Sequence, residues 1–239
     1  MATAERFAAA NGSYWAGVLP RLEQFVRLSN LGPERFARAI PIDFTPARQA
    51  FVSETAFMLW AHPIQTEPMR ARVVPAEAAA RDRLAELFSA TEIEAPLTRS
   101  EQAVALLMAR RLGEYSMSRR RLQHVEFEPR LPGCGVISSG VPDVVARDVS
   151  RHDSPLMIIE VKAVDRTFRS TDYRQLVCYT ILYFAARRLL PDVLALVNPL
   201  RGTAIEIGVE AFFYDVSGSS ADEVVQRLMT EWSALGISL

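Results

Sequence analysis

The chain has 239 residues, of which 49% are hydrophobic and 23% are charged, so its composition is ordinary for a globular protein and its length suits one large or two small domains. Its net charge of −1 gives no overall basic signal for a non-specific, high-affinity nucleic-acid binder, although it does not exclude a local basic groove. Two cysteines, Cys134 and Cys178, three scattered histidines and no CxxC exclude a zinc cluster. Neither a signal peptide nor an apolar stretch of about 18 residues is found, so we expect a reduced, cytoplasmic protein without a membrane span.

Residues 1–95 are predicted to form a helical region, because apolar residues recur there at helical spacing. Breaks are expected at Asn11-Gly12 and at Pro20. The predicted helices cover residues 2–30 with these breaks, a short stretch from Gly32-Pro33, a stretch that starts at the Thr45-Pro46 cap and ends before Pro63, and residues 75–90, followed by a linker over 92–96.

Residues 96–239 are predicted to form a second domain with the order α-β-β-β-α-β. The expected elements are a helix over 100–114 capped by Ser100, strands over 123–131, 136–146 and 156–164, a turn over 132–135, a helix over 172–190, strands over 193–198 and 204–214, and a final helix over 221–235. The fold class is therefore α/β, with a mixed central sheet of four or five strands flanked by helices.

The single lysine of the chain, Lys162, is the most informative residue. The other basic residues among the 27 Lys plus Arg are arginines, so a solvated positive charge is supplied elsewhere by Arg. Lys162 follows Glu160 and Val161 at the end of an apolar run that is predicted to be a strand buried on both faces. Because strand side chains alternate, Glu160 and Lys162 share one face and Val161 points to the other. Buried charges need a partner or a metal, so either a structural ion pair or a functional site is expected here.

A second carboxylate, Asp143, lies near the start of the preceding strand. A turn around residues 147–154 joins the two strands into a hairpin, which converges Asp143, Glu160 and Lys162. Two carboxylates with the Val161 carbonyl form a hard oxygen site suited to Mg²⁺, with Mn²⁺ as the other candidate. Such a metal activates water and offsets charge on a phosphodiester, and Lys162 then assists the nucleophile.

These residues resemble the PD-(D/E)XK nuclease superfamily, through Pro142-Asp143 and the Glu160-Val161-Lys162 triplet. Downstream, Gln175 and Tyr179 are similar to the Gln-x-x-x-Tyr helix of the RecB-like branch of that superfamily. The resemblance covers roughly residues 98–215 and implies a restriction-endonuclease-like fold. It also implies a place for Gln175 near the catalytic centre, while Tyr179 is interpreted as a core residue.

Glu101 is a further candidate for the catalytic site, because it shares a helical stripe with the apolar residues Ala105, Met108 and Leu112. The superfamily often has a Glu on this first helix. The alternative is an acid that stabilises the first helical turn. Arginines that flank the motif are candidates for binding the phosphates of a nucleic acid. The alternative is that they are solvated surface residues. They are Arg119, Arg120, Arg121, Arg166 and Arg169.

The sequence therefore predicts a Mg²⁺-dependent hydrolase that cleaves DNA phosphodiester bonds, with a role in bacterial defence or DNA processing suggested by the resemblance. DNA is the expected partner, with RNA as the alternative. The helical region 1–95 is the expected contact for a homodimer or a partner protein. The alternative is a nuclease-fold scaffold that binds without cleaving. A metabolic metalloenzyme is a third interpretation, but no cofactor loop such as GxGxxG is found.

Overall fold

The computed structural model describes residues 1–61, 68–85, 88 and 90–237, and it contains two compact units. Unit 1 comprises Met1–Arg35, Arg120–Asn198 and Thr203–Leu239, and unit 2 comprises Phe36–Arg119 with Pro199–Gly202. These units divide the chain at other positions than the predicted boundary near residue 95. The fold is α/β with mixed sheets flanked by helices, as expected. In the described part of the chain, no helix is long and apolar enough to cross a membrane.

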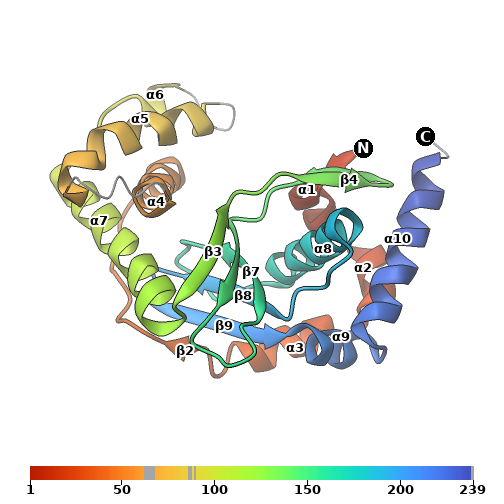
Figure 1. Cartoon of the computed structure of the whole chain (residues 1–239). Coiled ribbons are helices and arrows are strands. Elements are labelled where there is room, and N and C mark those ends of the chain that lie inside the picture. Colours follow the sequence, from red (N-terminus) through yellow and green to blue (C-terminus); the bar gives the residue numbers. More distant parts are fainter. Residues whose placement is uncertain (62–67, 86–87, 89, 238–239) are drawn as a thin grey trace. The chain divides into compact units, whose positions relative to one another are not determined.

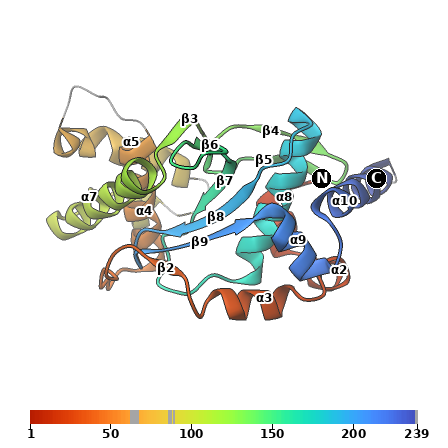
Figure 2. The same cartoon turned by 60° about the horizontal axis from the view of Figure 1, so that its bottom comes forward.

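A six-stranded mixed sheet in the order β2-β9-β8-β7-β6-β3 is the centre of unit 1. Its strands are β2 (Glu34–Arg35), β3 (Leu122–Phe127), β6 (Val144–Asp148), β7 (Leu156–Val161), β8 (Val193–Asn198) and β9 (Thr203–Gly208). β7 and β8 are parallel, and the other neighbours are antiparallel. Figure 2 shows β8 and β9 side by side in this sheet. The short helix predicted from Gly32-Pro33 is wrong, because residues 34–35 pair with β9 and add a strand to the sheet.

A smaller sheet of β1 (Ala2–Thr3), β5 (Ile137–Gly140) and β4 (Leu131–Cys134) belongs to the same unit. The single strands predicted over 123–131 and 136–146 are therefore wrong, since each divides between two sheets. The predicted turn at 132–135 is also wrong, because residues 131–134 form β4 and the turn follows at residues 135–136. Pro132 lies in β4 at the edge of its sheet, where a missing N–H is tolerated.

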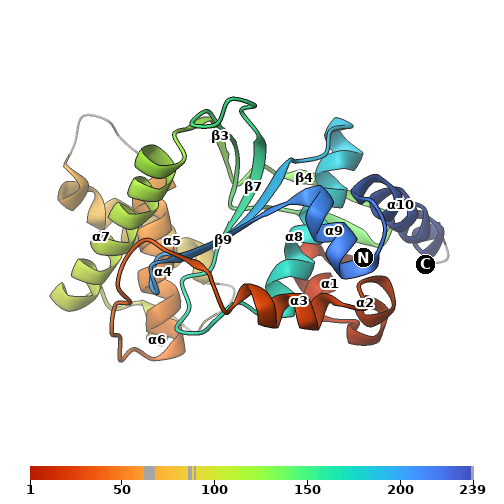
Figure 3. The same cartoon turned by 90° about the horizontal axis from the view of Figure 1, so that it is seen from below.

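Helices of unit 1 are α1 (Ala4–Ala9), α2 (Gly12–Val18), α3 (Leu22–Ser29), α8 (Ser170–Arg187), α9 (Val209–Ser217) and α10 (Ala221–Ile237). The breaks predicted at Asn11-Gly12 and Pro20 are confirmed, since they separate α1, α2 and α3 (Figure 3). The strand predicted over 204–214 is wrong beyond Gly208, because α9 begins at Val209. Tyr214 is exposed there while Phe212 and Phe213 are buried, which suits a helix that covers the core with one face.

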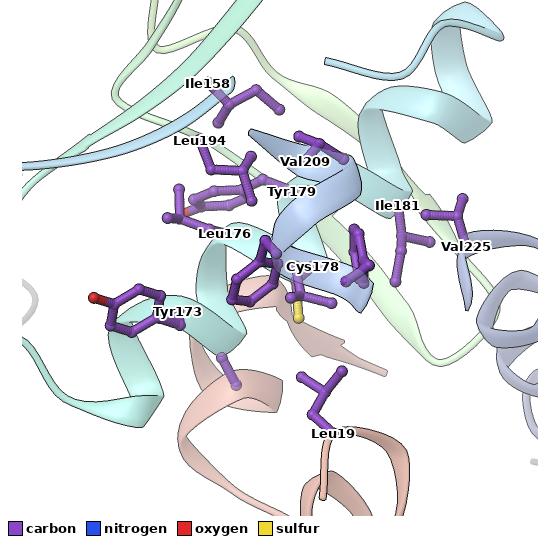
Figure 4. Packing of buried hydrophobic residues seen from close by; sticks show 14 of the residues in the cluster. Leu19, Ile158, Tyr173, Leu176, Cys178, Tyr179, Ile181, Leu194, Val209 and Val225 are labelled. Carbon is purple, nitrogen blue, oxygen red and sulfur yellow. The ribbon is translucent and has the colours of Figure 1, made fainter. Parts of the chain in front are cut away.

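Helix α8 packs on the central sheet and fills the core of unit 1. Ile158 of β7 and Leu194 of β8 join Leu176 and Tyr179 of α8 in one buried cluster (Figure 4). Because strand side chains alternate, the face of β7 that carries Ile158 also carries Glu160 and then Lys162. The polar residues at the end of β7 therefore lie on the face that α8 covers.

Unit 2 is a helical unit of α4 (Pro46–Ala61), the 3₁₀ segment η1 (Met69–Arg72), α5 (Val73–Leu84), α6 (Ala90–Ile93), α7 (Arg99–Gly113) and the π-helical segment η2 (Glu114–Arg119). Figure 1 shows α4 beside α5 and α7. Thr45 begins α4 as predicted, since its hydroxyl accepts a hydrogen bond from the Arg48 amide at 3.4 Å. The cap of α7 is Thr98 rather than the predicted Ser100. The helix predicted over 75–90 ends at Leu84, and Pro63 lies outside the described residues.

Candidate active site

Strands β6 and β7 bring the two predicted carboxylates to one end of a hairpin. Val144 pairs with Ile159 across this hairpin, so one further step along the same antiparallel register sets Asp143 opposite Glu160. Asp143 Oδ2 accepts a hydrogen bond from the Val161 amide at 2.6 Å, which ties the residue before β6 to the end of β7. The hairpin predicted from the sequence is therefore confirmed. Asp148, the last residue of β6, accepts hydrogen bonds from the Ser150 amide and hydroxyl in the turn that follows.

Glu160 and Lys162 share one face of β7 and bond directly to each other. Lys162 Nζ donates to Glu160 Oε1 at 2.7 Å, and the Glu160 side chain is only 5% exposed. The second carboxylate oxygen, Oε2, is buried and has no hydrogen-bond partner among the described residues. An unpartnered buried carboxylate oxygen costs free energy, and a water, an ion or another bound group removes that cost.

Gln175 completes the site from α8, the helix that covers this face of β7. Its side-chain Oε1 accepts from Lys162 Nζ at 2.7 Å, and its Nε2 donates to Glu160 Oε1 at 2.9 Å. The same Nε2 also donates to the hydroxyl of Tyr179 at 2.7 Å, one helical turn along α8. The predicted pair Gln175 and Tyr179 thus meets the Glu160–Lys162 pair, and Tyr179 is buried as expected.

Burial and charge set the protonation of these groups. Burial raises the pKa of the Glu160 carboxyl above its usual value, an effect that the charge of Lys162 opposes and that of Glu5 strengthens. Burial would lower the pKa of Lys162, but the charge and hydrogen bond of Glu160 outweigh it, so the pKa lies above its ordinary value. Lys162 is therefore an ammonium at neutral pH and acts as a donor rather than a base. Burial also raises the pKa of Tyr179, which keeps the phenol protonated.

Glu101 makes its contacts within unit 2. Both of its carboxylate oxygens are engaged by Arg48, at 2.8 and 2.7 Å, and Oε2 also accepts from the Thr98 amide at 2.7 Å in a capping box. The Arg48 guanidinium lowers the pKa of Glu101 to about 2. The helix-stabilising interpretation accounts for these contacts in full.

The predicted arginines fall into different environments. Arg120, in unit 1, bonds to Glu34 and Glu206, and Arg166 forms a bidentate pair with Asp172. The guanidinium of Arg119, in unit 2, lies 5.8 Å from the ring centroid of Phe36. Arg119, Arg121 and Arg169 are all exposed. Exposed cations are available to a polyanion, and because Arg119 already lies near an aromatic ring, Arg121 and Arg169 remain the strongest candidates for phosphate contact.

Sequence reasoning missed Glu5 and Asp172. The hydroxyl of Tyr179 donates to Glu5 Oε1 at 2.6 Å, which adds an N-terminal carboxylate to the network. Asp172 holds Arg166 and accepts from the Arg169 amide at 2.8 Å at the start of α8. The position of Asp172 three residues after Arg169, at a helix start, was a usable signal. Glu5 carries no local signal, because only tertiary packing brings α1 to α8.

The residues at this end of β7 fit a hard divalent cation by their chemistry. The described residues hold no cluster of three or more His, Cys, Asp and Glu side chains suited to a metal. Asp143, Glu160 and the Val161 carbonyl are oxygen donors, and Oε2 of Glu160 lacks a partner in the described structure. Mg²⁺ needs few protein ligands because it keeps several waters.

Comparison with protein-family models finds no match for this chain, and comparison with curated proteins finds none.

Proposed function

We propose that this protein is a Mg²⁺-dependent nuclease that hydrolyses DNA phosphodiester bonds. The observation that carries the proposal is the buried network of Glu160, Lys162 and Gln175 beside Asp143, in which Oε2 of Glu160 has no partner in the described structure. Burial of an ion pair is costly unless its polar atoms are hydrogen-bonded, and a cation bound at Oε2 would supply the missing interaction.

The order of elements supports the same proposal. Along the chain, α7, β3, β6, β7, α8 and β8 follow the α-β-β-β-α-β order implied by the resemblance to PD-(D/E)XK nucleases, with the β4–β5 hairpin added between β3 and β6. The reversal to a parallel β7–β8 pair after α8 requires a crossover, which α8 supplies. We assign the central sheet to a restriction-endonuclease-like core on this basis.

Asp143, Glu160 and the Val161 carbonyl would hold the metal. When bound, Mg²⁺ or Mn²⁺ supplies positive charge that makes a water a better nucleophile and offsets charge on the phosphodiester. Lys162 holds its proton at Nζ and donates to the attacking water or to a phosphate oxygen, in addition to its bond with Glu160. Gln175 orients both Glu160 and Lys162 through its amide. Arg121 and Arg169 would grip the backbone outside the site.

Cleavage assays with purified protein test the proposal. Linear, circular and single-stranded DNA, with RNA in parallel, are incubated with Mg²⁺ or Mn²⁺. We expect wild-type cleavage and its loss in Asp143→Asn and Glu160→Gln, because each change removes a carboxylate ligand. Asp153→Asn is the matched control, since Asp153 is an exposed acid of the β6–β7 turn. Equal cleavage in all four proteins rejects the assignment of the site. No cleavage and no Mg²⁺ binding by wild type favours the scaffold alternative.

A further inference from the structure

The N-terminal helix α1 contributes an acidic side chain to the network around Glu160. Glu5 Oε1 accepts the proton of the Tyr179 hydroxyl at 2.6 Å, and that hydroxyl accepts from Gln175 Nε2 at 2.7 Å. Gln175 in turn bonds to Glu160 and Lys162. A continuous chain of hydrogen bonds therefore runs from α1 through α8 to the end of β7.

The small sheet sets the position of Glu5. β1 pairs in parallel with β5, with Thr3 opposite Ser139, so α1 begins just after this pair and the segment leading to Asp143 follows it. The Ser138 hydroxyl bonds to the Ala2 carbonyl at 3.2 Å, which holds the start of the chain in register. One strand pair therefore orients both the helix that carries Glu5 and the segment that carries Asp143.

Gly140 permits the close contact between α1 and α8. A Cβ at this position would lie 2.6 Å from Leu182 Cδ1, 3.1 Å from Tyr179 Cδ1 and 3.2 Å from Ala4 Cβ. The missing side chain lets the Tyr179 ring, which lies in the core beside Leu176 (Figure 4), pack against the strand next to α1. The absence of a Cβ at Gly140 therefore leaves room for both Tyr179 and Ala4, the residue that precedes Glu5.

The direction of the hydrogen bonds gives Glu5 a definite effect. A carboxylate only accepts, so the single proton of the Tyr179 hydroxyl points to Glu5. The hydroxyl oxygen is then free to accept from Gln175 Nε2. Both Nε2 hydrogens are in this way assigned, one to Tyr179 and one to Glu160, and Oε1 of Gln175 faces the Lys162 ammonium. Without an acceptor at position 5, the phenol proton can turn toward Gln175 and compete with Nε2.

We infer that Glu5 is a positioning residue of the active site, which acts through Tyr179 to hold the Gln175 amide against Glu160 and Lys162. Its consequence for metal binding and catalysis rests on the proposed nuclease function. Outer hydrogen-bond partners of metal ligands change affinity or activity by about 10- to 100-fold, so the effect of Glu5 falls within a measurable range.

Solvent exchange of the Gln175 side-chain amide protons, followed by NMR, tests the inference without any activity. The signals are assigned by their absence in Gln175→Leu. We expect exchange about tenfold faster in Glu5→Ala, where the phenol proton competes with the amide, and in Tyr179→Phe, where the amide loses an acceptor. Glu5→Gln keeps an acceptor oxygen and should preserve slow exchange. Tyr183→Phe, one turn further on α8, and Glu23→Ala, which breaks the surface pair with Arg174 of α8, are the controls.

Calorimetric titration of Mg²⁺ without DNA is the second measurement. Affinity should fall about tenfold or more in Glu5→Ala and Tyr179→Phe, and stay near wild type in Glu5→Gln and both controls. In cleavage assays kcat should fall while KM for DNA holds. Wild-type amide exchange in Glu5→Ala and Tyr179→Phe overturns the inference, whatever the protein cleaves. Inactive wild-type protein with the expected exchange pattern removes the nuclease proposal and leaves the positioning of Gln175 standing.

Discussion

At the scale of single residues, Lys162 offers the sharpest test of the site. Its Nζ bonds to Glu160 and Gln175, both at 2.7 Å, so its head group is held from two sides. Lys162→Arg keeps the charge but replaces a compact ammonium by a larger planar fork. We expect the single-turnover cleavage rate to fall by at least about tenfold, or about 1.4 kcal/mol in barrier. Arg151→Lys, in the exposed turn, should change nothing, and full activity of Lys162→Arg means that charge alone is needed.

Glu101 makes a prediction about pH at the same scale. Arg48 lowers its pKa from 4.5 to about 2, so the ion pair stabilises the folded state fully above pH 4.5, and this contribution is lost as pH falls toward 2. Glu101→Gln should lower the free energy of unfolding at pH 7 by roughly 2 kcal/mol. Its difference from wild type should shrink between pH 4.5 and 2.

Urea unfolding at several pH values measures this difference, with Glu114→Gln as the control at the exposed end of α7. The opposite pattern would support the catalytic interpretation of Glu101. In that case Glu101→Gln would abolish cleavage and leave the stability unchanged at every pH.

At the scale of elements, tertiary pairing overrode local pattern in several places. Residues 136–146 have the apolar content of one strand, but they divide into β5 and β6, which pair in different sheets. The proline at position 142 has no N–H to donate, which suits the break. Residues 209–214 contain Val and aromatic residues that favour a strand, yet they form α9. By contrast, β8 has the bounds predicted from its apolar run, because its six residues are all buried.

Gly140 carries the prediction that belongs to this scale, since it is where β5 meets α1 and α8. In Gly140→Ala the new Cβ meets Leu182, Tyr179 and Ala4 at 2.6–3.2 Å, so at least one element must shift. We expect a loss of about 1–3 kcal/mol in the free energy of unfolding, measured with urea. Gly17→Ala in the exposed part of α2 is the control, because its Cβ meets nothing within 4 Å and a helical Ala should be neutral or stabilising. Equal stability of the two variants would contradict the close packing.

For the whole molecule, a net charge of −1 must be reconciled with the proposed DNA substrate. Affinity then depends on local arginines, and the structure sorts them by whether their charge is already paired. Arg121→Ala and Arg169→Ala should each reduce the slope of log K against log salt by about 0.9 on duplex DNA. Arg120→Ala should lower the free energy of unfolding and leave this slope nearly unchanged, because Arg120 bonds to Glu34 and Glu206. Fluorescence anisotropy with Ca²⁺ at several salt concentrations measures the slopes, and identical slopes in all variants would place the DNA contact elsewhere.

The sequence by itself determined the α/β class, the hairpin of Asp143 and Glu160, the shared face of Glu160 and Lys162, and the helix that carries Gln175. These features follow from short-range rules, namely strand alternation, helical spacing and a turn that joins neighbouring strands. Only the tertiary structure decided that Glu5 reaches the site, that Arg48 bonds to both carboxylate oxygens of Glu101, and that Oε2 of Glu160 stays unpartnered within the described structure. Each of these depends on segments far apart in the chain, whose contacts are set by packing and are not encoded in any local pattern.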